Sequence, residues 1–384
     1  MEGYEIPNLK SPPPRAAYIH VPFCDHRCGY CNFTLVAGRD DLIDAYLEAL
    51  ERELSWLERP REVDTLYFGG GTPTHLAPAQ LDRLCQIALG WHPLATGYEW
   101  AVEANPGDLD QATIDVLARY GVNRISLGAQ SFDAAKLVTL ERDHQATDIA
   151  RAVQLVQSIN ADVALDLIFA TPGETLSTWS ADLDAAIQLA PSHISTYGLT
   201  FERGTLFWNR LLHKALEKVN EELERSMYSL AIDTLTDAGF DHYEISNFAR
   251  PNHRSRHNEG YWSGAGYFAA GPGAARYVDG VRSTNHLSTT TWLRRVLADQ
   301  SPVAESETLA PEDRARETLV FSLRRLEGVD RTAFTRQTGF EIDQLVGQPL
   351  RHYIELGMLL DDRQRIRLSR QGLLVSDAIW PDFL

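Results

Sequence analysis

Residues 18–31 read Tyr-Ile-His-Val-Pro-Phe-Cys-Asp-His-Arg-Cys-Gly-Tyr-Cys, which places Cys24, Cys28 and Cys31 directly after a short apolar run. A disulfide framework would spread its cysteines along the chain, whereas thiolates this close together more often share a metal centre. Three thiolates on one loop can hold a 4Fe-4S cube and leave its fourth iron open. The stretch therefore predicts a metal centre that follows the first strand of the fold.

Zinc is the alternative metal for this loop, with His20 or His26 as the fourth ligand of a tetrahedral site. Common zinc signatures pair two cysteines as Cys-x-x-Cys with a second pair elsewhere, and the spacing here differs from that pattern. The fourth cysteine, Cys85, lies in residues 81–89, where apolar residues follow helical spacing. That spacing predicts a buried, inert thiol.

Short apolar runs alternate with amphipathic stretches from residue 17 to about residue 200. Six of the runs have the composition of strands: Ala17–Val21, Thr65–Phe68, Glu99–Glu103, Arg124–Leu127, Ala164–Phe169 and His193–Leu199. Residues 42–57 carry an apolar stripe at helical period, and a shorter helix ends at Gly121. Six such units imply a parallel sheet with helices outside, either an incomplete barrel or a doubly wound sheet.

Polar residues follow the ends of these predicted strands. The three cysteines follow the first strand, Gly69–Gly71 follow the second, Glu103 closes the third, Gln130 lies just past the fourth, and Asp166 lies near the end of the fifth. In both candidate folds the carboxyl ends of parallel strands share one edge, where ligands bind. The sequence therefore predicts one site at that edge.

Composition narrows the functional classes. The 384 residues contain 36 Lys and Arg against 53 Asp and Glu, a net charge of −17 that repels nucleic-acid phosphates. No apolar run has the length of a membrane helix. Residues 1–14 lack the basic and apolar regions of a secretory signal, so the expected compartment is the cytoplasm.

The chain beyond residue 200 changes character. A charged helix is expected over residues 216–238, before a segment rich in Gly, Asn, His and aromatics at 247–277. The end of the chain predicts a winged-helix-like unit: helices at 311–326, 331–338 and 342–357, a hairpin at 358–368 and a closing helix from Ser369. Residues 301–384 carry 14 acidic residues, 11 Arg and no Lys, which favours a scaffold or lid over DNA binding.

Residues 18–31 resemble the signature of radical S-adenosylmethionine proteins, with Tyr30 at the aromatic position before the third cysteine. In that superfamily the amino and carboxylate groups of the cofactor chelate the open iron. Further motifs make the chain similar to the branch that resembles oxygen-independent coproporphyrinogen oxidase: Gly69-Gly-Gly-Thr72-Pro-Thr74, Glu103-Ala-Asn-Pro106, Gly128-Ala-Gln130-Ser131, Arg142 and Asp166 to Gly173. The resemblance covers residues 15–384 and implies a partial (β/α)6 barrel with a C-terminal helical, winged-helix-like domain.

The resemblance implies four segments: an N-terminal segment 1–14, the barrel 15–200, an α/β extension 201–285 and the C-terminal domain 286–384. It implies that Cys24, Cys28 and Cys31 hold the cluster. The residues implied for S-adenosylmethionine are Tyr18, Tyr30, Gly70, Gly71, Thr72, Glu103, Gln130, Arg142 and Asp166. Their chemistry agrees, because glycine amides suit a charged group, carboxylates suit cations and hydroxyls, and arginine suits a carboxylate. Hydrogen bonds at a barrel rim would explain the same residues.

Two departures separate the chain from the oxidase itself. The oxidase pattern has a fourth cysteine two residues beyond the third and a longer segment before the cluster. Here Phe33 stands at the fourth position and 23 residues precede Cys24. Both departures make the chain similar to heme chaperones of the HemW type, which share the cluster and S-adenosylmethionine elements but bind heme and deliver it to hemoproteins.

The chaperone group carries an H-N-x-x-Y-W pattern, which His257, Asn258, Tyr261 and Trp262 match. These four are the heme-site candidates, since imidazole can ligate heme iron and aromatic faces can stack on a porphyrin. The alternative is that His257 and Asn258 brace a loop while Tyr261 and Trp262 pack between domains.

The resulting expectation is a cytoplasmic heme chaperone that binds a 4Fe-4S cluster, S-adenosylmethionine and heme, and whose recipients are hemoproteins. A respiratory recipient would require transient contact with the membrane surface, although no basic amphipathic helix indicates one. The rival functions are oxidative decarboxylation of coproporphyrinogen by a radical mechanism and a zinc-stabilised interaction protein.

Overall fold

The computed structural model describes residues 13–384, so almost all of the predicted N-terminal segment, 1–14, lies outside the described residues. Its centre is a nine-stranded sheet in the order β11-β1-β4-β5-β6-β7-β8-β10-β9. The six middle strands are parallel and confirm the six predicted runs: β1 (Ala16–Val21), β4 (Val63–Gly70), β5 (Leu94–Ala104), β6 (Arg124–Gln130), β7 (Asp162–Phe169) and β8 (His193–Gly198). Their order along the sheet never reverses, so the fold is a partial barrel and not a doubly wound sheet.

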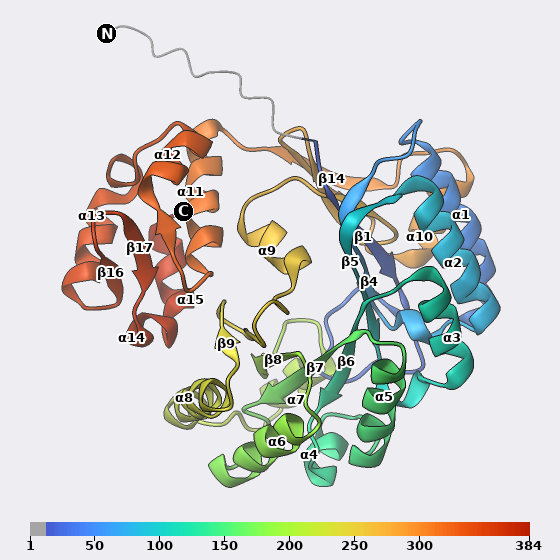
Figure 1. The fold of residues 1–384 in the computed structure, drawn as a ribbon, viewed down its shortest axis with the longest axis horizontal. Coiled ribbons are helices and arrows are strands. Elements are labelled where there is room, and N and C mark those ends of the chain that lie inside the picture. The colour runs from blue at the N-terminus through green and yellow to red at the C-terminus, as the bar shows by residue number, and fades with distance from the viewer. Residues whose placement is uncertain (1–12) are drawn as a thin grey trace, which may run out of the picture.

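Helices cover the outer face of this sheet, as Figure 1 shows. They are α1 (Ile43–Ser55), α2 (Pro78–Trp91), α3 (Gln111–Tyr120), α5 (Ala146–Ser158), α6 (Leu176–Gln188) and α8 (Glu221–Asp237). Helices α4 (Ala134–Thr139) and α7 (Leu206–Leu212) lie instead at the carboxyl ends of the strands, where Leu140 and Phe207 join a separate small hydrophobic cluster. The expected end of α3 is confirmed, because Gly121 caps it with a positive φ of 80°. Helix α8 begins five residues later than expected, because the Asn220 side chain accepts a hydrogen bond from the Leu223 amide and caps the helix there.

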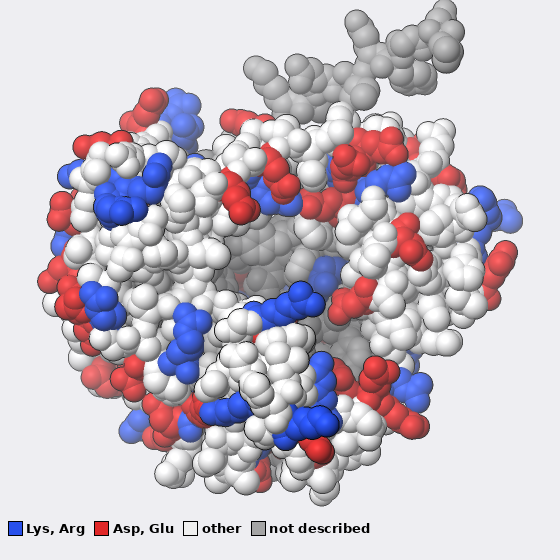
Figure 2. Space-filling model, turned by 180° about the vertical axis from the view of Figure 1, so that it is seen from behind, with Lys and Arg blue, Asp and Glu red and all other residues white. Residues whose placement is uncertain are grey.

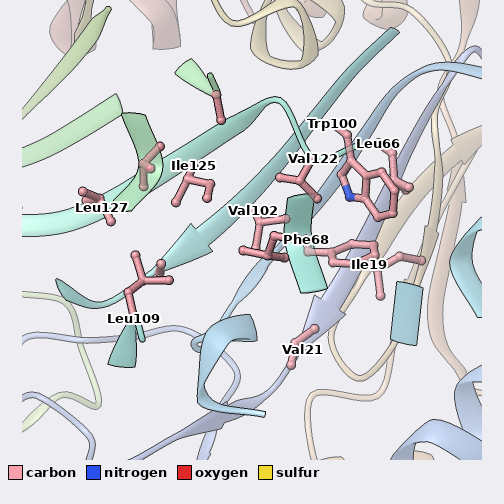
Figure 3. Packing of buried hydrophobic residues seen from close by; sticks show 14 of the residues in the cluster. Ile19, Val21, Leu66, Phe68, Trp100, Val102, Leu109, Val122, Ile125 and Leu127 are labelled. Carbon is pink, nitrogen blue, oxygen red and sulfur yellow. The ribbon is translucent and has the colours of Figure 1, made fainter. Parts of the chain in front are cut away.

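Alternate residues of the strands form the core between sheet and helices. Ile19, Leu66, Phe68, Trp100 and Val102 are all fully buried, and Figure 3 shows them gathered on one face of the sheet. The Phe68 and Trp100 rings meet edge to face with centroids 5.3 Å apart. Because side chains alternate along a strand, the residues between these point toward the barrel interior.

Short strands far along the chain extend the sheet at both edges. Strand β11 (Phe268–Ala270) pairs in parallel with β1, while β10 (Asn247–Ala249) pairs antiparallel with β8 and carries β9 (Asp241–His242). Strands β2 (Phe23–Cys24) and β3 (Val36–Ala37) pair with each other and close the cysteine loop. Helix α9 (Arg256–Trp262) lies between the barrel and the C-terminal unit (Figure 1).

The last part of the chain has its own hydrophobic cluster, which begins at Ala315. It contains α11 (Pro311–Leu323), β15 (Val329–Asp330), α12 (Arg331–Thr338), α13 (Ile342–Glu355), β16 (Leu359–Asp361) and β17 (Arg365–Leu368). Three helices and the predicted hairpin agree with the winged-helix-like expectation. The closing helix from Ser369 is interrupted instead, as α14 (Arg370–Leu373) and α15 (Ser376–Ile379), because Val375 between them has non-helical dihedrals. Helix α13 is kinked at Val346. Pro349 lies in the same helix, and in a straight helix its ring would clash with the Leu345 carbonyl, directly before the kink.

Residues 275–308 form a three-stranded sheet and one helix: β12 (Ala275–Val278), β13 (Val281–Asn285), α10 (Thr289–Leu297) and β14 (Val303–Thr308). Helix α10 packs against α1, where the Trp292 indole lies 5.6 Å from the Tyr46 ring and donates a hydrogen bond to buried Glu53. The boundary at residue 285 stays a prediction, and this packing favours a later one, near the start of α11.

Acidic and basic side chains are mixed over the rear face of the molecule, which is hollowed near its middle (Figure 2). Among residues 13–384, no helix combines the length and apolar character needed to span a bilayer.

Candidate functional site

A cavity of about 570 Å³ lies at the carboxyl ends of the parallel strands. Its lining brings together most of the predicted site residues, from elements that are far apart in sequence: Cys24, Cys28, Tyr30, Cys31, Gly70, Gly71, Thr72, Glu103, Gln130, Arg142, Asp166 and Asn258. The expectation that the strand ends share one site agrees with this arrangement. We call this space the cluster cavity.

The three cysteine thiols face each other across one end of the cluster cavity. The pKa of Cys24 is raised to about 11, mainly by burial and partly by the neighbouring Cys31 and Cys28 thiols, while the hydrogen bond with Thr72 opposes the rise. Arg142 Nη1 lies 3.5 Å from Cys28 Sγ, which places one fixed positive charge beside the sulfur ligands. Three converging thiols with an arginine beside them fit a cluster of iron and sulfur that carries negative charge.

Hydrogen bonds link two of these thiols through other side chains. Cys24 Sγ lies 3.1 Å from Thr72 Oγ1, which accepts a hydrogen bond from Asn105 Nδ2. Arg142 Nη2 in turn donates to Asn105 Oδ1 at 2.5 Å. Asn105 was not among the predicted site residues, although it belongs to the Glu103-Ala-Asn-Pro motif. A polar residue two positions past Glu103 projects to the same side of the chain, which is the signal that identifies it.

The geometry disfavours His20 as a zinc ligand. His20 Nδ1 lies 3.0 Å from the Tyr18 hydroxyl and Nε2 lies 2.7 Å from the Thr34 carbonyl, so both ring nitrogens have partners. His26 Nε2 lies 2.6 Å from the Glu141 carbonyl and 3.6 Å from Cys28 Sγ. In the part of the chain that the structure describes, one group of side chains has potential ligand atoms close enough together to hold a single ion. This group consists of Asp25, His26 and Asp143 and includes no cysteine.

Glu103 ends β5 and is held between two donors. Its Oε1 accepts a hydrogen bond from the Tyr67 hydroxyl at 2.8 Å, and its Oε2 accepts one from the Gly70 amide at 2.9 Å. Burial raises the pKa of this carboxyl to about 7, and nearby Asp166 raises it as well. The carboxyl group therefore titrates near neutral pH.

The Gly70 and Gly71 amides are both engaged within the protein and are not open to a ligand. The Gly70 amide donates to Glu103, and the Gly71 amide donates to the Val21 carbonyl at 2.8 Å. Position 70 requires glycine for steric reasons. Gly70 has a φ of +111°, and a Cβ at this position would clash with the His20 ring. The sharp turn at the end of β4 therefore accounts for Gly70.

Asp166 on β7 lies between two serines that the sequence analysis did not select. Its Oδ2 accepts a hydrogen bond from Ser126 at 2.8 Å, and a further bond from Ser195 lowers its pKa, but burial has the larger effect and raises that pKa. Ser126 precedes Gly128 and Gln130 at intervals of two, so strand alternation could have identified it.

Helix α9 holds His257 inside the barrel with both ring nitrogens engaged. Nδ1 lies 2.8 Å from Thr65 Oγ1 and Nε2 lies 2.8 Å from the Tyr261 hydroxyl. The imidazole also stacks on the Tyr67 ring at 5.0 Å, and burial lowers its pKa to about 3. These contacts favour the bracing role over iron ligation for His257.

Tyr18, Tyr261 and Trp262 do not line the cluster cavity. They line a second cavity of about 650 Å³ near the carboxyl end of α9, which we call the aromatic cavity. Asn32 and Phe33, just past the third cysteine, line both cavities. The site residues inferred from the sequence thus divide between two cavities, except His257, which lines neither.

Comparison with known proteins assigns this architecture. Residues 18–186 match the Radical SAM superfamily and residues 309–375 match the HemN C-terminal domain. The chain is 34% identical to the heme chaperone HemW of Lactococcus lactis subsp. lactis, over 97% of both chains. It is 32% identical to the mitochondrial radical S-adenosyl methionine domain-containing protein 1 of Danio rerio, over 96% of this chain and 86% of that protein.

Among solved structures, the coproporphyrinogen III oxidase HemN of Escherichia coli superimposes with a TM-score of 0.85. The match covers 97% of this chain and 90% of that one at 21% identity. It confirms the fold expected from the sequence, a radical SAM partial barrel with the C-terminal domain, and at this identity it carries no conclusion about the reaction.

Proposed function

The chain belongs to the family of the heme chaperone HemW within the radical SAM superfamily, and on that basis we propose that it binds heme and transfers it to hemoproteins. It would also carry a 4Fe-4S cluster that binds S-adenosylmethionine. Similarity to chaperones along 97% of both chains supports the proposal. So does a cavity that gathers three thiols, an arginine and two buried carboxyls at the barrel rim.

In this proposal Cys24, Cys28 and Cys31 hold the cluster, which supplies an iron that the amino and carboxylate groups of S-adenosylmethionine can chelate. Arg142 offsets the negative charge of the sulfur ligands and, through Asn105, orients Thr72 beside Cys24. The buried carboxyls of Glu103 and Asp166 accept from cationic or hydroxyl groups of the bound molecule.

One observation favours the chaperone over the oxidase: Phe33 stands where the oxidase pattern has its fourth cysteine. The Phe33 side chain is 60% exposed and lies on the rim that both cavities share, so it adds an apolar surface where the oxidase would have a thiol. The experiment that tests the proposal compares heme uptake with coproporphyrinogen conversion by the same anaerobically reconstituted protein.

The proposed setting is the cytoplasm, with hemoproteins, respiratory ones among them, as recipients. The net charge of −17 argues against a nucleic-acid partner.

Glu103→Gln is expected to weaken S-adenosylmethionine binding by roughly ten-fold to a hundred-fold, because it replaces a charged hydrogen-bond acceptor with a neutral one. The pH dependence should change too. A ligand that needs the Glu103 carboxylate must displace its proton below the pKa of about 7, so wild-type affinity should fall as pH decreases through that value. The Asp166 carboxyl and the Tyr67 hydroxyl also face the Glu103 carboxyl. The glutamine variant therefore shows how much of the pH dependence comes from Glu103. Calorimetry at about pH 6 and about pH 8 measures both effects.

Iron and sulfide contents provide the control, since the cluster should remain in place. Unchanged affinity together with an unchanged pH dependence would remove Glu103 from the binding site.

A further inference from the structure

The aromatic cavity lies where the barrel meets the C-terminal unit. One wall comes from Tyr18 on β1 and from Phe33 in the cysteine loop, a second from Tyr261 and Trp262 of α9, and a third from α11. Its volume of about 650 Å³ falls within the range of sites that enclose a small organic ligand. Helix α11 belongs to the segment that matches the HemN C-terminal domain, so the C-terminal unit forms one wall of the aromatic cavity.

The lining suits a large flat ligand. Seven of its nineteen residues are Phe, Tyr or Trp, against 9% in the whole chain. Tyr261 and Tyr267 meet edge to face at 4.6 Å, and Trp262 and Phe321 do so at 6.3 Å. The Trp262 Nε1 donor is buried and finds no acceptor among residues 13–384. Aromatic faces with one unused donor form a surface that a macrocycle with polar substituents can cover.

The cavity also carries positive charge in an acidic protein. Arg282 and Arg314 line it against one acidic residue, Glu317, although the chain as a whole has a net charge of −17. Both guanidinium groups lie over the Tyr277 ring, at 5.9 Å and 5.3 Å from its centroid. Arg282 is held by ion pairs with Glu307 and Glu317. Arginine forks recognise carboxylates, which heme presents as two propionates on one edge.

The cluster cavity is a poorer match for the same ligand. Its lining holds two arginines, Arg124 and Arg142, against five acidic residues: Asp25, Glu103, Asp143, Asp166 and Glu202. This excess of acidic groups disfavours the propionates of heme. His257 has no free nitrogen for an iron there or in the aromatic cavity.

Resting on the proposed function, we infer that heme is carried in the aromatic cavity, stacked between Phe33 and the α9 aromatics, with its propionates toward Arg314. His257 then acts as a positioning residue that holds the Tyr261 hydroxyl through its Nε2. In this arrangement the protein retains heme through stacking on aromatic side chains and through pairing of the propionates with arginine. Ligation of the heme iron by His257 is not required.

Two variants of the full, reconstituted chain test this location by titration with heme and absorbance detection. Arg314→Gln should weaken heme binding by roughly ten-fold to a hundred-fold, because a hydrogen bond between charged groups is lost. Ala265→Trp places a bulky ring at an exposed position of the lining and should prevent saturation at concentrations that fill the wild type. Arg316→Gln is the matched control, because Arg316 lies on the same helix, pairs with Glu312 and lines neither cavity.

S-adenosylmethionine affinity should stay at the wild-type value in all three variants, which shows that they fold. Protoporphyrin IX without metal should bind within about ten-fold of heme, and heme dimethyl ester should bind as weakly to the wild type as heme does to Arg314→Gln. Wild-type heme affinity in both Arg314→Gln and Ala265→Trp would overturn the location and leave the proposed function standing. No heme binding by the wild type would overturn the proposed function itself.

Discussion

Replacing Cys24, Cys28 or Cys31 with alanine is expected to leave the protein without a stable 4Fe-4S cluster. All three thiols line one cavity and no fourth cysteine lies there, since Cys85 is fully buried in α2. Each replacement removes a ligand that no neighbour can supply. Iron, sulfide and zinc assays on anaerobically reconstituted protein measure the effect.

Cys85→Ala is the control and should retain wild-type iron and sulfide. Normal cluster content in any one of the three cavity variants would show that its cysteine is not a ligand. Zinc in place of iron and sulfide in the wild type would support the zinc-stabilised interaction protein.

Lys136→Met is expected to destabilise the barrel by about 3–5 kcal/mol, because it leaves two buried carboxylates without their cation. Lys136 Nζ lies 2.5 Å from Glu174 Oε1 and 2.9 Å from Asp182 Oδ2, and all three side chains are at most 5% exposed. Asp182 also accepts hydrogen bonds from Ser131 and from the Phe132 amide, so the network fixes the loop after β6.

Denaturant unfolding followed by circular dichroism measures this loss. Lys214→Met, at an exposed position after α7, should change the free energy of unfolding by less than about 0.5 kcal/mol. Equal stability of the two variants would mean that the buried carboxyls are satisfied without Lys136.

The parallel barrel could be predicted from the sequence because its signal is local. Each of the six strands is a compact apolar run, and the cysteines, glycines and polar residues at the ends of five of them mark the edge where ligands bind. The site residues Glu103, Gln130 and Asp166 follow from that rule alone. Periodicity could not choose between the two sheet topologies, since strand order is a property of pairing between distant segments.

The aromatic cavity could not be predicted, because it exists only through contacts that are remote in sequence. Strand β11 brings residues near 268 beside β1, and α11 brings Arg314 against Tyr277. No periodic pattern connects these segments. One partner of His257 was hidden for the same reason, because Thr65 lies 192 positions away. The chemistry of a histidine is visible in a sequence, but whether its nitrogens are free is not.

The most direct test of the heme-chaperone proposal follows two substrates with one anaerobic, reconstituted preparation that contains S-adenosylmethionine and a reductant. The proposal predicts stoichiometric heme binding, transfer of that heme to an apo-hemoprotein, and no protoporphyrinogen formed from coproporphyrinogen. Sustained conversion of coproporphyrinogen to protoporphyrinogen, with no transferable heme, would contradict it.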